Sequence, residues 1–366
     1  MRVCILSLLL LFLGCGPLAT SWDEAEEAIS YTAIEIAPPP TAVDTILVMT
    51  WNIRYGAGRI PWFGDGCGDR VLLTEREVIG NLKVVADKIN DTKPDILILQ
   101  EVDVESKRTA FVDQVQWLLD HTHLNYGAYA SYWQVQFIPS DGLGRMDAGN
   151  AILSRWNFTE TERVPLPLRG DQSSLTQYFY LRRNILKVKL DLPSYEDFYA
   201  VGVHTAAFST DDTKQNHINT LKEELDALDN TGALFVAGGD LNELPPESDS
   251  TDYCDEDKCD GESFHSSDDD HKEGAYYGLE TTWLNGLYRG YRPAIRLNEY
   301  FGDNVSYFTY FIHDFTESSP PHASGGRKLD YLFTNLSWAT DSDSTHQGAT
   351  RLSDHIPISA KLVLSP

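Results

Sequence analysis

One short run restricts the fold of this chain more than any other, because an apolar segment in it ends directly in polar groups. The run extends from Phe235 to Pro245 and reads F-V-A-G-G-D-L-N-E-L-P. Its apolar part is closed by Gly238 and Gly239, a pattern that predicts a buried strand. Asp240 and Asn242, two residues apart, then lie on one face of an extended segment. Polar groups at the ends of core strands are where α/β enzymes usually carry their chemistry.

Strand-like and helix-like patterns alternate from Thr45 onward. Apolar residues recur at helical spacing from Val78 to Ile89 and from Ile218 to Leu228. The remaining apolar runs predict strands at residues 46–52, 95–100, 151–154, 184–190, 198–204, 234–238, 330–334 and 358–363. Many neighbouring strands with only occasional helices favour sheets packed together, with helices outside, over a doubly wound βαβ repeat.

The composition is that of a globular protein with one unusually acidic segment. The 366 residues are 42% hydrophobic and 23% charged, enough to bury a sizeable core. The formal net charge is −26, and residues 247–273, with twelve acids and two lysines, supply ten of those negative charges. The remainder is still acidic, which disfavours tight binding to a polyanion such as DNA. A nuclease that binds weakly and turns over quickly is compatible with this charge.

The acidic segment 247–273 is an insertion into the strand and helix pattern, and its simplest interpretation is a solvated loop. Cys254, Cys259 and two nearby histidines could instead form a zinc site. The spacing between the cysteine pair and the histidine pair is short for such a site. A calcium loop is the third interpretation, although the acids do not follow the EF-hand spacing. In an exported protein the two cysteines could form a disulfide, which would leave Cys67 over.

The first 20 residues predict a targeting segment. Arg2 gives a positive start, and Ile5 to Leu13 is an apolar core that is too short to span a bilayer. The run L-F-L-G-C resembles a bacterial lipobox, in which Cys15 would be lipidated after cleavage. Phe12 is a poor match to the aliphatic residue usual at that position. We therefore expect an exported protein that is either secreted or lipid-anchored through Cys15 at the bacterial cell envelope.

The rest of the chain predicts a tether and one domain. Residues 21–44 are acidic and then proline-rich, which is typical of a tether. Residues 45–366 show no internal repeat, no second linker and no composition break other than the acidic insertion 247–273. A single domain is the economical interpretation.

Polar groups recur at the predicted strand ends. Taken singly, each could be a turn former, a helix cap or a surface group. In chain order they stand in the motifs W-N-I-R with Asn52, L-Q-E-V with Glu101, V-H-T with His204, G-D-L-N with Asp240 and Asn242, L-D-Y with Asp330, and S-D-H with Asp354 and His355. Together and in this order, the motifs resemble those of the endonuclease/exonuclease/phosphatase superfamily. The resemblance covers Ile46 to Val363.

The resemblance implies a fold and a reaction class. The fold is the deoxyribonuclease-I-like one, a four-layered α/β/β/α sandwich, and the activity is that of a metal-dependent phosphoesterase. Phosphoester cleavage needs charge neutralisation on the nonbridging oxygens, an in-line nucleophile and help for the leaving oxygen. Mg²⁺, the expected cofactor with Mn²⁺ as its alternative, takes oxygen ligands and needs only one or two carboxylates.

The resemblance also implies roles for the oxygen-bearing side chains. Glu101 matches the main metal ligand of the family, with Asn52 beside it. Asp354 stands where a further carboxylate facing the metal or its ligands is expected. Asp240 resembles the group that activates or orients the attacking water, and Asn242 resembles the group that holds Asp240 or the phosphate.

Two histidines complete the implied site. His355 resembles the catalytic imidazole, with Asp330 as the carboxylate that fixes its tautomer and stabilises the imidazolium. His204 matches the second histidine of the nuclease and sphingomyelinase branches, where it serves as proton donor or phosphate contact. The glutamate that accompanies it there has no clear counterpart in this sequence. Asn150, in the run G-N-A-I-L-S-R, resembles a family position near the phosphate. An amide that merely begins a strand is the competing interpretation.

The motifs leave the substrate open, because this superfamily cleaves DNA, RNA, sphingomyelin, inositol phosphates and nucleotides with one centre and selects among them with loops. The aromatic segments Tyr55–Gly68 and Tyr126–Phe137 could stack a base or contact a lipid surface, with loop packing as the alternative. No cluster of basic residues is typical of a nucleic-acid footprint. Arg182 and Arg183 are adjacent, so only one of them would face the site from a strand.

We therefore expect an exported, Mg²⁺-dependent phosphodiesterase that acts on a small or lipid-linked phosphoester. One alternative is a secreted endonuclease that acts on DNA or RNA. The other is an envelope binding protein that kept the fold and lost catalysis. Apart from the substrate and a membrane contact through a lipidated Cys15, the sequence indicates no partner.

Overall fold

The computed structural model describes residues 18–62, 68–138, 140–207, 209, 211–248, 281–311 and 326–364. Residues 1–17 of the predicted targeting segment, with Cys15, lie outside the described residues, whereas its last residues lie against the folded body, where Ala19 pairs with Val135 and is buried. Cys67, Cys254 and Cys259 also lie outside the described residues, and with them the zinc, calcium and disulfide interpretations of the acidic insertion.

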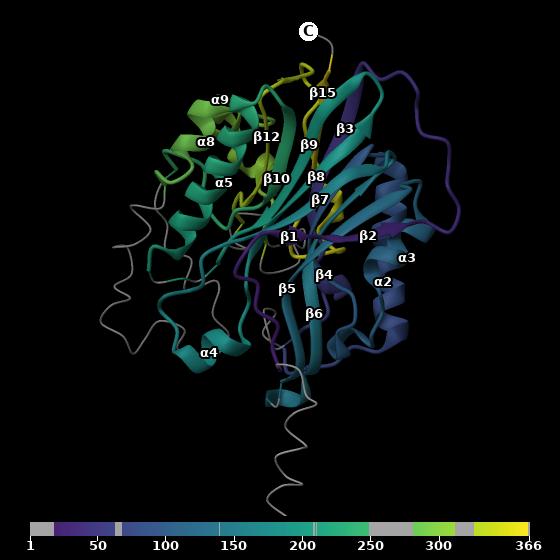
Figure 1. Ribbon diagram of the computed structural model, residues 1–366, viewed down its shortest axis with the longest axis vertical. Coiled ribbons are helices and arrows are strands. Elements are labelled where there is room, and N and C mark those ends of the chain that lie inside the picture. The colour runs from purple at the N-terminus through teal and green to yellow at the C-terminus, as the bar shows by residue number, and fades with distance from the viewer. Residues whose placement is uncertain are drawn as a thin grey trace, which may run out of the picture.

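Two β-sheets form the centre of the molecule (Figure 1). One sheet consists, in spatial order, of β1 (Glu26–Glu27), β7 (Phe158–Pro165), β8 (Asn184–Leu192), β9 (Tyr195–His204), β10 (Leu234–Asp240), β12 (Asp330–Thr334) and β11 (Arg292–Pro293). The other consists of β13 (Ser337–Trp338), β15 (Ile358–Val363), β3 (Thr45–Asn52), β4 (Ile96–Asp103), β6 (Gly144–Ser154), β5 (Tyr126–Ile138) and β2 (Ile29–Thr32), with β14 (Ser344–Thr345) paired to β15.

Helices cover the outer faces of the two sheets. The eight-stranded sheet packs against α2 (Glu75–Thr92) and α3 (Gln114–His121), and the seven-stranded sheet against α5 (Thr213–Asn230) and α8 (Asn285–Gly290). Two shorter helices, α4 (Ser174–Phe179) and α9 (Leu297–Gly302), complete the described set. The order helix, sheet, sheet, helix is the α/β/β/α sandwich that the sequence predicts, so the predicted fold is confirmed.

The longest helix of the first pair shows how the sequence determines these elements. Thr74 and Glu77 form a capping box at the start of α2, which satisfies two backbone donors and contributes about 1 kcal/mol. Apolar residues at helical spacing then bury one face against the sheet: Val78, Leu82, Val85, Ala86 and Ile89. The helix ends where Lys93 adopts the left-handed conformation.

The main core lies between the two sheets, where alternate residues of each strand point inward. Fully buried side chains contribute from both sides, including Val48, Ile98 and Ile152 from one sheet and Leu186, Ala200 and Val236 from the other. Seven of the eight predicted strands lie within observed ones, the eighth begins one residue before β4, and both predicted helices lie within α2 and α5. Within the described ranges, no helix is both long enough and apolar enough to cross a membrane.

The N-terminal segment differs from the prediction of a tether over residues 21–44. Within it, β1 pairs with β7 and β2 pairs with β5, while Ala28 between them is buried in the core. Each sheet would otherwise have an edge of unpaired backbone groups, and a short strand can satisfy them. Part of the predicted tether therefore belongs to the folded body and closes one side of the sandwich.

Candidate active site

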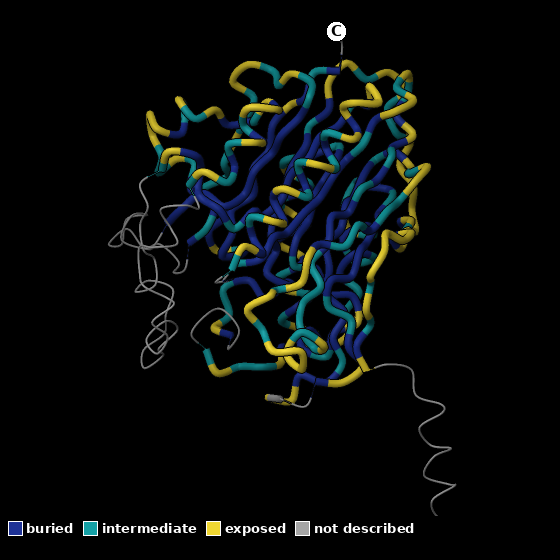
Figure 2. Tube along the Cα trace, turned by 60° about the vertical axis from the view of Figure 1, so that its left-hand side comes forward, coloured by how far each residue is buried: buried dark blue, intermediate teal, exposed yellow. Residues whose placement is uncertain are grey.

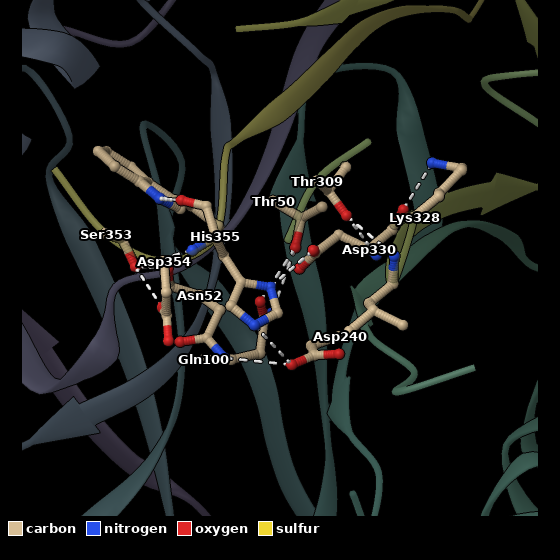
Figure 3. Close-up of polar contacts among 12 residues, drawn as sticks. Thr50, Asn52, Gln100, Asp240, Thr309, Lys328, Asp330, Ser353, Asp354 and His355 are labelled. Carbon is tan, nitrogen blue, oxygen red and sulfur yellow. Dashed lines mark hydrogen bonds and ion pairs between the residues drawn. The ribbon is translucent and has the colours of Figure 1, made fainter. Parts of the chain in front are cut away.

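The polar motifs converge because the strands that carry them end on the same side of the sandwich. In one sheet Asn52 ends β3 opposite Gln100 of the parallel strand β4. In the other sheet Asp240 ends β10, paired with His204 on the parallel β9 and with Asp330 on the antiparallel β12. The two sheets face each other, so side chains from both reach one small volume (Figure 3).

Asp240 lies at the centre of this volume. Its Oδ2 accepts a hydrogen bond from Asn52 Nδ2 at 3.1 Å and lies 3.3 Å from His204 Nε2 and 3.5 Å from His355 Nε2. Its Oδ1 accepts the backbone N–H of Asn242 at 2.9 Å. The structure thus brings four other predicted residues around the Asp240 carboxylate.

The surroundings of Asp240 change its acidity. Burial raises its pKa to about 6, and the nearby Asp330 carboxylate adds to the rise, while His355 opposes it. A carboxyl group with this pKa is mostly ionised at neutral pH, yet it can accept and return a proton there. Asp240 therefore has the position and the acidity of a general base.

His355 and Asp330 form a buried pair. His355 Nδ1 lies 2.8 Å from Asp330 Oδ2, and the ring lies between Asp330 and Asp240 (Figure 3). Burial lowers the pKa of His355, but the carboxylates of Asp330 and Asp240 outweigh it and raise that pKa to about 10. His355 is therefore an imidazolium at neutral pH, stabilised by the Asp330 carboxylate that orients it.

The backbone of Asp330 is fixed from behind. Thr309 Oγ1 accepts the N–H groups of Leu329 and Asp330, both at 3.0 Å. The buried Lys328 donates its ammonium to the Asp330 carbonyl at 2.7 Å. These contacts hold the carboxylate in place against the imidazole.

His204 differs from His355 in its charge. It is buried, and its Nδ1 has no hydrogen-bond partner among the described residues. Burial, together with the positive charges of Arg183 and His355, lowers the pKa of His204 well below its ordinary value. A neutral His204 that donates from Nε2 toward Asp240 leaves Nδ1 as a buried acceptor. This agrees with the missing glutamate partner noted in the sequence.

Glu101 reaches the site from a distortion in β4. The pairing of β4 with β6 shifts between Leu99 and Val102, and Glu101 there has a positive φ of 56°. Such a bulge redirects a side chain, and Glu101 Oε1 lies 4.0 Å from His204 Nε2. The predicted main metal ligand is therefore at the site, held by locally unusual backbone geometry.

Asp354 makes an ion pair that the sequence did not predict. Arg54 Nε lies 3.4 Å from Asp354 Oδ2, and Ser353 Oγ hydrogen-bonds Asp354 Oδ1 at 3.0 Å. Burial raises the pKa of Asp354, but Arg54 and the neighbouring His355 outweigh it, so that this pKa is lowered. Arg54 also donates its backbone N–H to Asn52 Oδ1 at 3.0 Å, and its ion pair with Asp354 links the first and last motifs.

The residues present fit a hard cation. Carboxylate and amide oxygens suit Mg²⁺ and Mn²⁺, and the buried Asp330 Oδ1 has no hydrogen-bond partner among the described residues. Asp240, Asp330 and His355 offer ligand atoms within 4.8 Å of one another, so this group could hold a metal ion. Both ring nitrogens of His355 face carboxylates, however. The positive charge of the protonated ring therefore already balances negative charge on Asp240 and Asp330. Glu101 and Asn52 therefore stay the predicted metal ligands.

The two remaining predicted residues have different surroundings. Asn242, with a φ of 47°, donates Nδ2 to the Thr205 carbonyl at 3.2 Å, and this fixes the loop that follows Asp240. Asn150 donates to Asn184 Oδ1 at 3.1 Å and so joins the two sheets. The contact of Asn150 with a phosphate stays a prediction.

An arginine and a tyrosine extend the site beyond the predicted residues. The Arg183 guanidinium lies over the Tyr132 ring, with 4.9 Å to its centroid, and Tyr132 packs edge-on against His204 at 6.1 Å. Of the adjacent arginines, Arg183 is the one whose charge affects His204. In the sequence, only the adjacent arginines and the aromatic segment Tyr126–Phe137 pointed to these two residues. Neither pattern shows which side chain faces the site.

The comparisons with known proteins agree with this geometry. Residues 49–355 match the Endonuclease/Exonuclease/phosphatase family. The fold is similar to that of an endonuclease/exonuclease/phosphatase from Beutenbergia cavernae, with a TM-score of 0.59 at 18% identity, covering 88% of this chain and 72% of that one. No curated protein matches.

Two further solved structures match this chain over almost the whole of their own length. A Bacteroides vulgatus endonuclease/exonuclease/phosphatase has a TM-score of 0.51 at 15% identity, over 88% of this chain and 99% of that one. A functionally unknown conserved protein from Enterococcus faecalis has a TM-score of 0.51 at 16% identity, over 87% and 99%. Identities this low show a shared fold alone, whereas the family match spans most of the sequence. This chain belongs to the Endonuclease/Exonuclease/phosphatase family.

Proposed function

We propose that this protein is a Mg²⁺-dependent phosphodiesterase that acts outside the cytoplasm on a small or lipid-linked phosphoester. The observation that carries the proposal is the arrangement around Asp240. One buried carboxylate with a pKa of about 6 lies between a charged imidazole, His355, and a neutral one, His204. A water-activating base beside a fixed positive charge is what hydrolysis of a phosphodiester requires.

The side chains have complementary tasks in this reaction. Asp240 accepts the proton of the attacking water, while Asn52 and Asn242 hold its two oxygens. The imidazolium of His355, stabilised by Asp330, attracts the negatively charged phosphate oxygens. His204 is neutral and buried, and it contacts Asp240 through Nε2. The leaving oxygen takes its proton from the imidazolium of His355, and the proton that Asp240 has accepted from water then returns to the imidazole.

A hard divalent cation would supply charge neutralisation on the phosphate oxygens. Glu101 and Asn52 would hold it, with Asp354 as a further carboxylate nearby. Arg54 keeps Asp354 ionised, since its positive charge lowers the pKa of that carboxyl. The eight-stranded sheet thus provides the oxygen ligands together with His355, which lies just before β15, and the other sheet provides Asp240 and Asp330.

Charge favours a small or lipid-linked substrate over a polymer. The net charge of −26 opposes approach of a polyanion. The apolar start of the sequence, with its lipobox-like run, supports export. A secreted endonuclease is the second candidate, favoured by the Arg183–Tyr132 stack, which offers a positive charge and an aromatic ring beside the site. An inactive binding protein is disfavoured, because binding alone has no need of the complete set around Asp240.

Hydrolysis of bis-p-nitrophenyl phosphate tests the proposal. The full chain is assayed with Mg²⁺, with Mn²⁺ and with EDTA, beside the variants Asp240→Ala and His355→Ala. His121→Ala is the matched control, because His121 is an exposed histidine on α3. We expect metal-dependent hydrolysis that the two site variants lose and the control keeps. Absence of metal-dependent hydrolysis of this diester and also of DNA, sphingomyelin and inositol phosphates would overturn the proposal.

A further inference from the structure

Four large apolar side chains are exposed on neighbouring segments at one end of the molecule. Their exposed fractions are 48% for Leu18, 56% for Phe137, 71% for Leu175 and 37% for Tyr178. Two hydrogen bonds connect the segments that carry them: the Leu18 carbonyl accepts the N–H of Gln136 at 2.7 Å, and the Ala19 N–H donates to the Tyr178 hydroxyl at 3.4 Å. We call these four side chains the apolar end patch.

The patch is built on elements that are fixed in place. α4, which carries Leu175 and Tyr178, is anchored where Trp133 Nε1 donates to the Phe179 carbonyl at 2.7 Å. Yet none of the residues of α4 is buried. Leu175 and Tyr178 are three residues apart, so they lie on the same face of the helix. One exposed leucine is ordinary, but several exposed apolar side chains on neighbouring, anchored segments are typical of an interaction surface.

The patch lies beyond the active site in the direction in which the catalytic strands end. Along the eight-stranded sheet, Tyr129 is paired with Ala151 and Ala151 with Leu99, one residue before the Gln100 that pairs with Asn52. Phe137 follows eight residues further along β5, roughly 25 Å past that level. In Figure 1 α4 and the far ends of β5 and β6 lie at the bottom, opposite the C-terminus.

The N-terminal sequence enters the molecule at this patch. Leu18 is part of it, and the chain that precedes Leu18 contains the apolar run Ile5–Leu13 and Cys15. Two residues separate Cys15 from Leu18, so a lipid on Cys15 would be attached within roughly 10 Å of the patch. An anchor and an apolar surface at the same end would face the same bilayer.

We propose that the apolar end patch docks on the surface of a zwitterionic lipid bilayer, with the active site turned toward the head groups. Leucine and aromatic side chains enter the interfacial region readily. The net charge of −26 opposes both an anionic membrane and a second copy of the same chain. That the substrate is then a phosphoester of a lipid head group rests on the proposed function, whereas the docking surface itself does not.

Vesicle flotation tests the surface. The full chain carries Cys15→Ala so that no lipid anchor forms, and it is mixed with phosphatidylcholine vesicles or with vesicles that also contain anionic phosphatidylglycerol. The patch variant is Phe137→Ser with Leu175→Ser. The matched control is Ile34→Ser with Phe301→Ser, two exposed apolar residues that lie outside the patch. Melting temperatures report whether each variant folds.

We expect the Cys15→Ala chain and the control to float with phosphatidylcholine vesicles, and the patch variant to bind about tenfold more weakly. Binding should also be weaker on the anionic vesicles. Equal binding by the patch variant and the control would overturn the inference, because the apolar run Ile5–Leu13 would then account for the binding. Concentration-dependent dimerisation lost in the patch variant, without vesicle binding, would also overturn it in favour of a second copy.

Hydrolysis of a soluble diester by the same preparations keeps the two proposals apart. Patch-dependent flotation without any hydrolysis would contradict the proposed function and leave the docking surface standing. Metal-dependent hydrolysis without patch-dependent flotation would contradict the docking surface alone.

Discussion

At the scale of single residues, the site depends on two imidazoles that carry different charges beside one carboxylate. His355 is held positive by Asp330 and Asp240, whereas burial and Arg183 keep His204 neutral. The sequence placed all three groups at strand ends and the family motifs implied their roles. It could not show that His204 Nδ1 is unpartnered or that Arg54 pairs with Asp354, because those depend on side-chain directions across the two sheets.

The orienting role of Asp330 predicts a large loss of activity from a small change. Asp330→Asn keeps the shape but removes the negative charge that stabilises the His355 imidazolium. We expect kcat for a soluble diester to fall roughly 10²- to 10⁴-fold with little change in KM. The pH profile should shift as well, because the pKa of His355 falls without its partner. A profile identical to that of the unchanged protein would contradict this role.

The raised pKa of His355 also predicts how stability depends on pH. Its pKa is about 10 in the folded protein and about 6.5 when unfolded, so the stabilisation is fully present below about pH 6.5 and is lost as the pH rises through about 10. Lys328 opposes this in the same interval, because burial lowers its pKa to about 7 and its destabilising effect is greatest at low pH. The comparison must therefore be made between variants at each pH.

In EDTA-containing buffer, the difference in unfolding free energy between the unchanged protein and His355→Gln should shrink from pH 7 to pH 10, by an amount of order 1–3 kcal/mol. Urea denaturation at each pH measures it. The exposed-histidine variant His121→Gln is the control and should show a constant difference. A difference for His355→Gln that is also constant would mean that the folded protein does not hold this imidazole charged.

At the scale of elements, the amino-acid composition of a strand decided whether the sequence predicted it. Strands with long apolar runs were predicted, but β5 and β7 were not. β5 reads Y-G-A-Y-A-S-Y-W-Q-V-Q-F-I, in which aromatic and small residues conceal a strand. β7 is mostly polar because it lies toward the edge of its sheet, where only β1 covers it. β1 and β2 are too short for periodicity to indicate them, so their pairing is visible only in the tertiary structure.

The end of β10 requires a glycine immediately before Asp240. Gly239 has a φ of 145°, and a Cβ there would lie 1.9 Å from the Val203 carbonyl oxygen of the neighbouring strand. Gly239→Ala should therefore lower the unfolding free energy by roughly 2–4 kcal/mol and reduce kcat, because Asp240 moves with the strand. Gly286→Ala is the control, since a Cβ there meets nothing within 4 Å and alanine favours the helix. Equal stability of the two variants would refute the argument.

The N-terminal strands predict a stability effect far from the site. Ala28 donates its N–H to the Thr161 carbonyl at 3.2 Å and is buried between the sheets. Ala28→Pro removes that donor, and we expect a loss of roughly 1–3 kcal/mol in thermal or urea unfolding. Ala25→Pro, at an exposed position just before β1, should change stability by less than about 0.5 kcal/mol. If neither variant is destabilised, residues 21–44 behave as the predicted tether.

At the scale of the whole molecule, exposed residues cover the outer helices while the sheets between them are buried (Figure 2). The charge of −26 belongs to this surface and to the acidic insertion. The sequence alone was enough to predict the net charge and the order of the layers. It could not show where the apolar end patch lies, because its four residues come from three separate segments of the chain.

The charge predicts how salt affects cleavage of a polyanion. A protein that grips DNA through phosphate contacts loses affinity steeply as salt rises, whereas repulsion between an acidic protein and DNA is relieved by salt. We expect any hydrolysis of duplex DNA to be much slower than that of a soluble diester and to stay level or rise with added NaCl at fixed Mg²⁺. A steep fall on a double-logarithmic plot would favour the endonuclease alternative.

The segment that closes one side of the sandwich also constrains the order of folding. Glu26 pairs with Arg163 and Ile29 with Tyr129, so these first strands wait for partners that the ribosome makes a hundred or more residues later. Until then the nascent chain carries short strands with no sheet to join, and the growing sheets have open edges that can pair with other chains. A chaperone that delays collapse during synthesis would therefore raise the yield of this protein more than it raises the final stability.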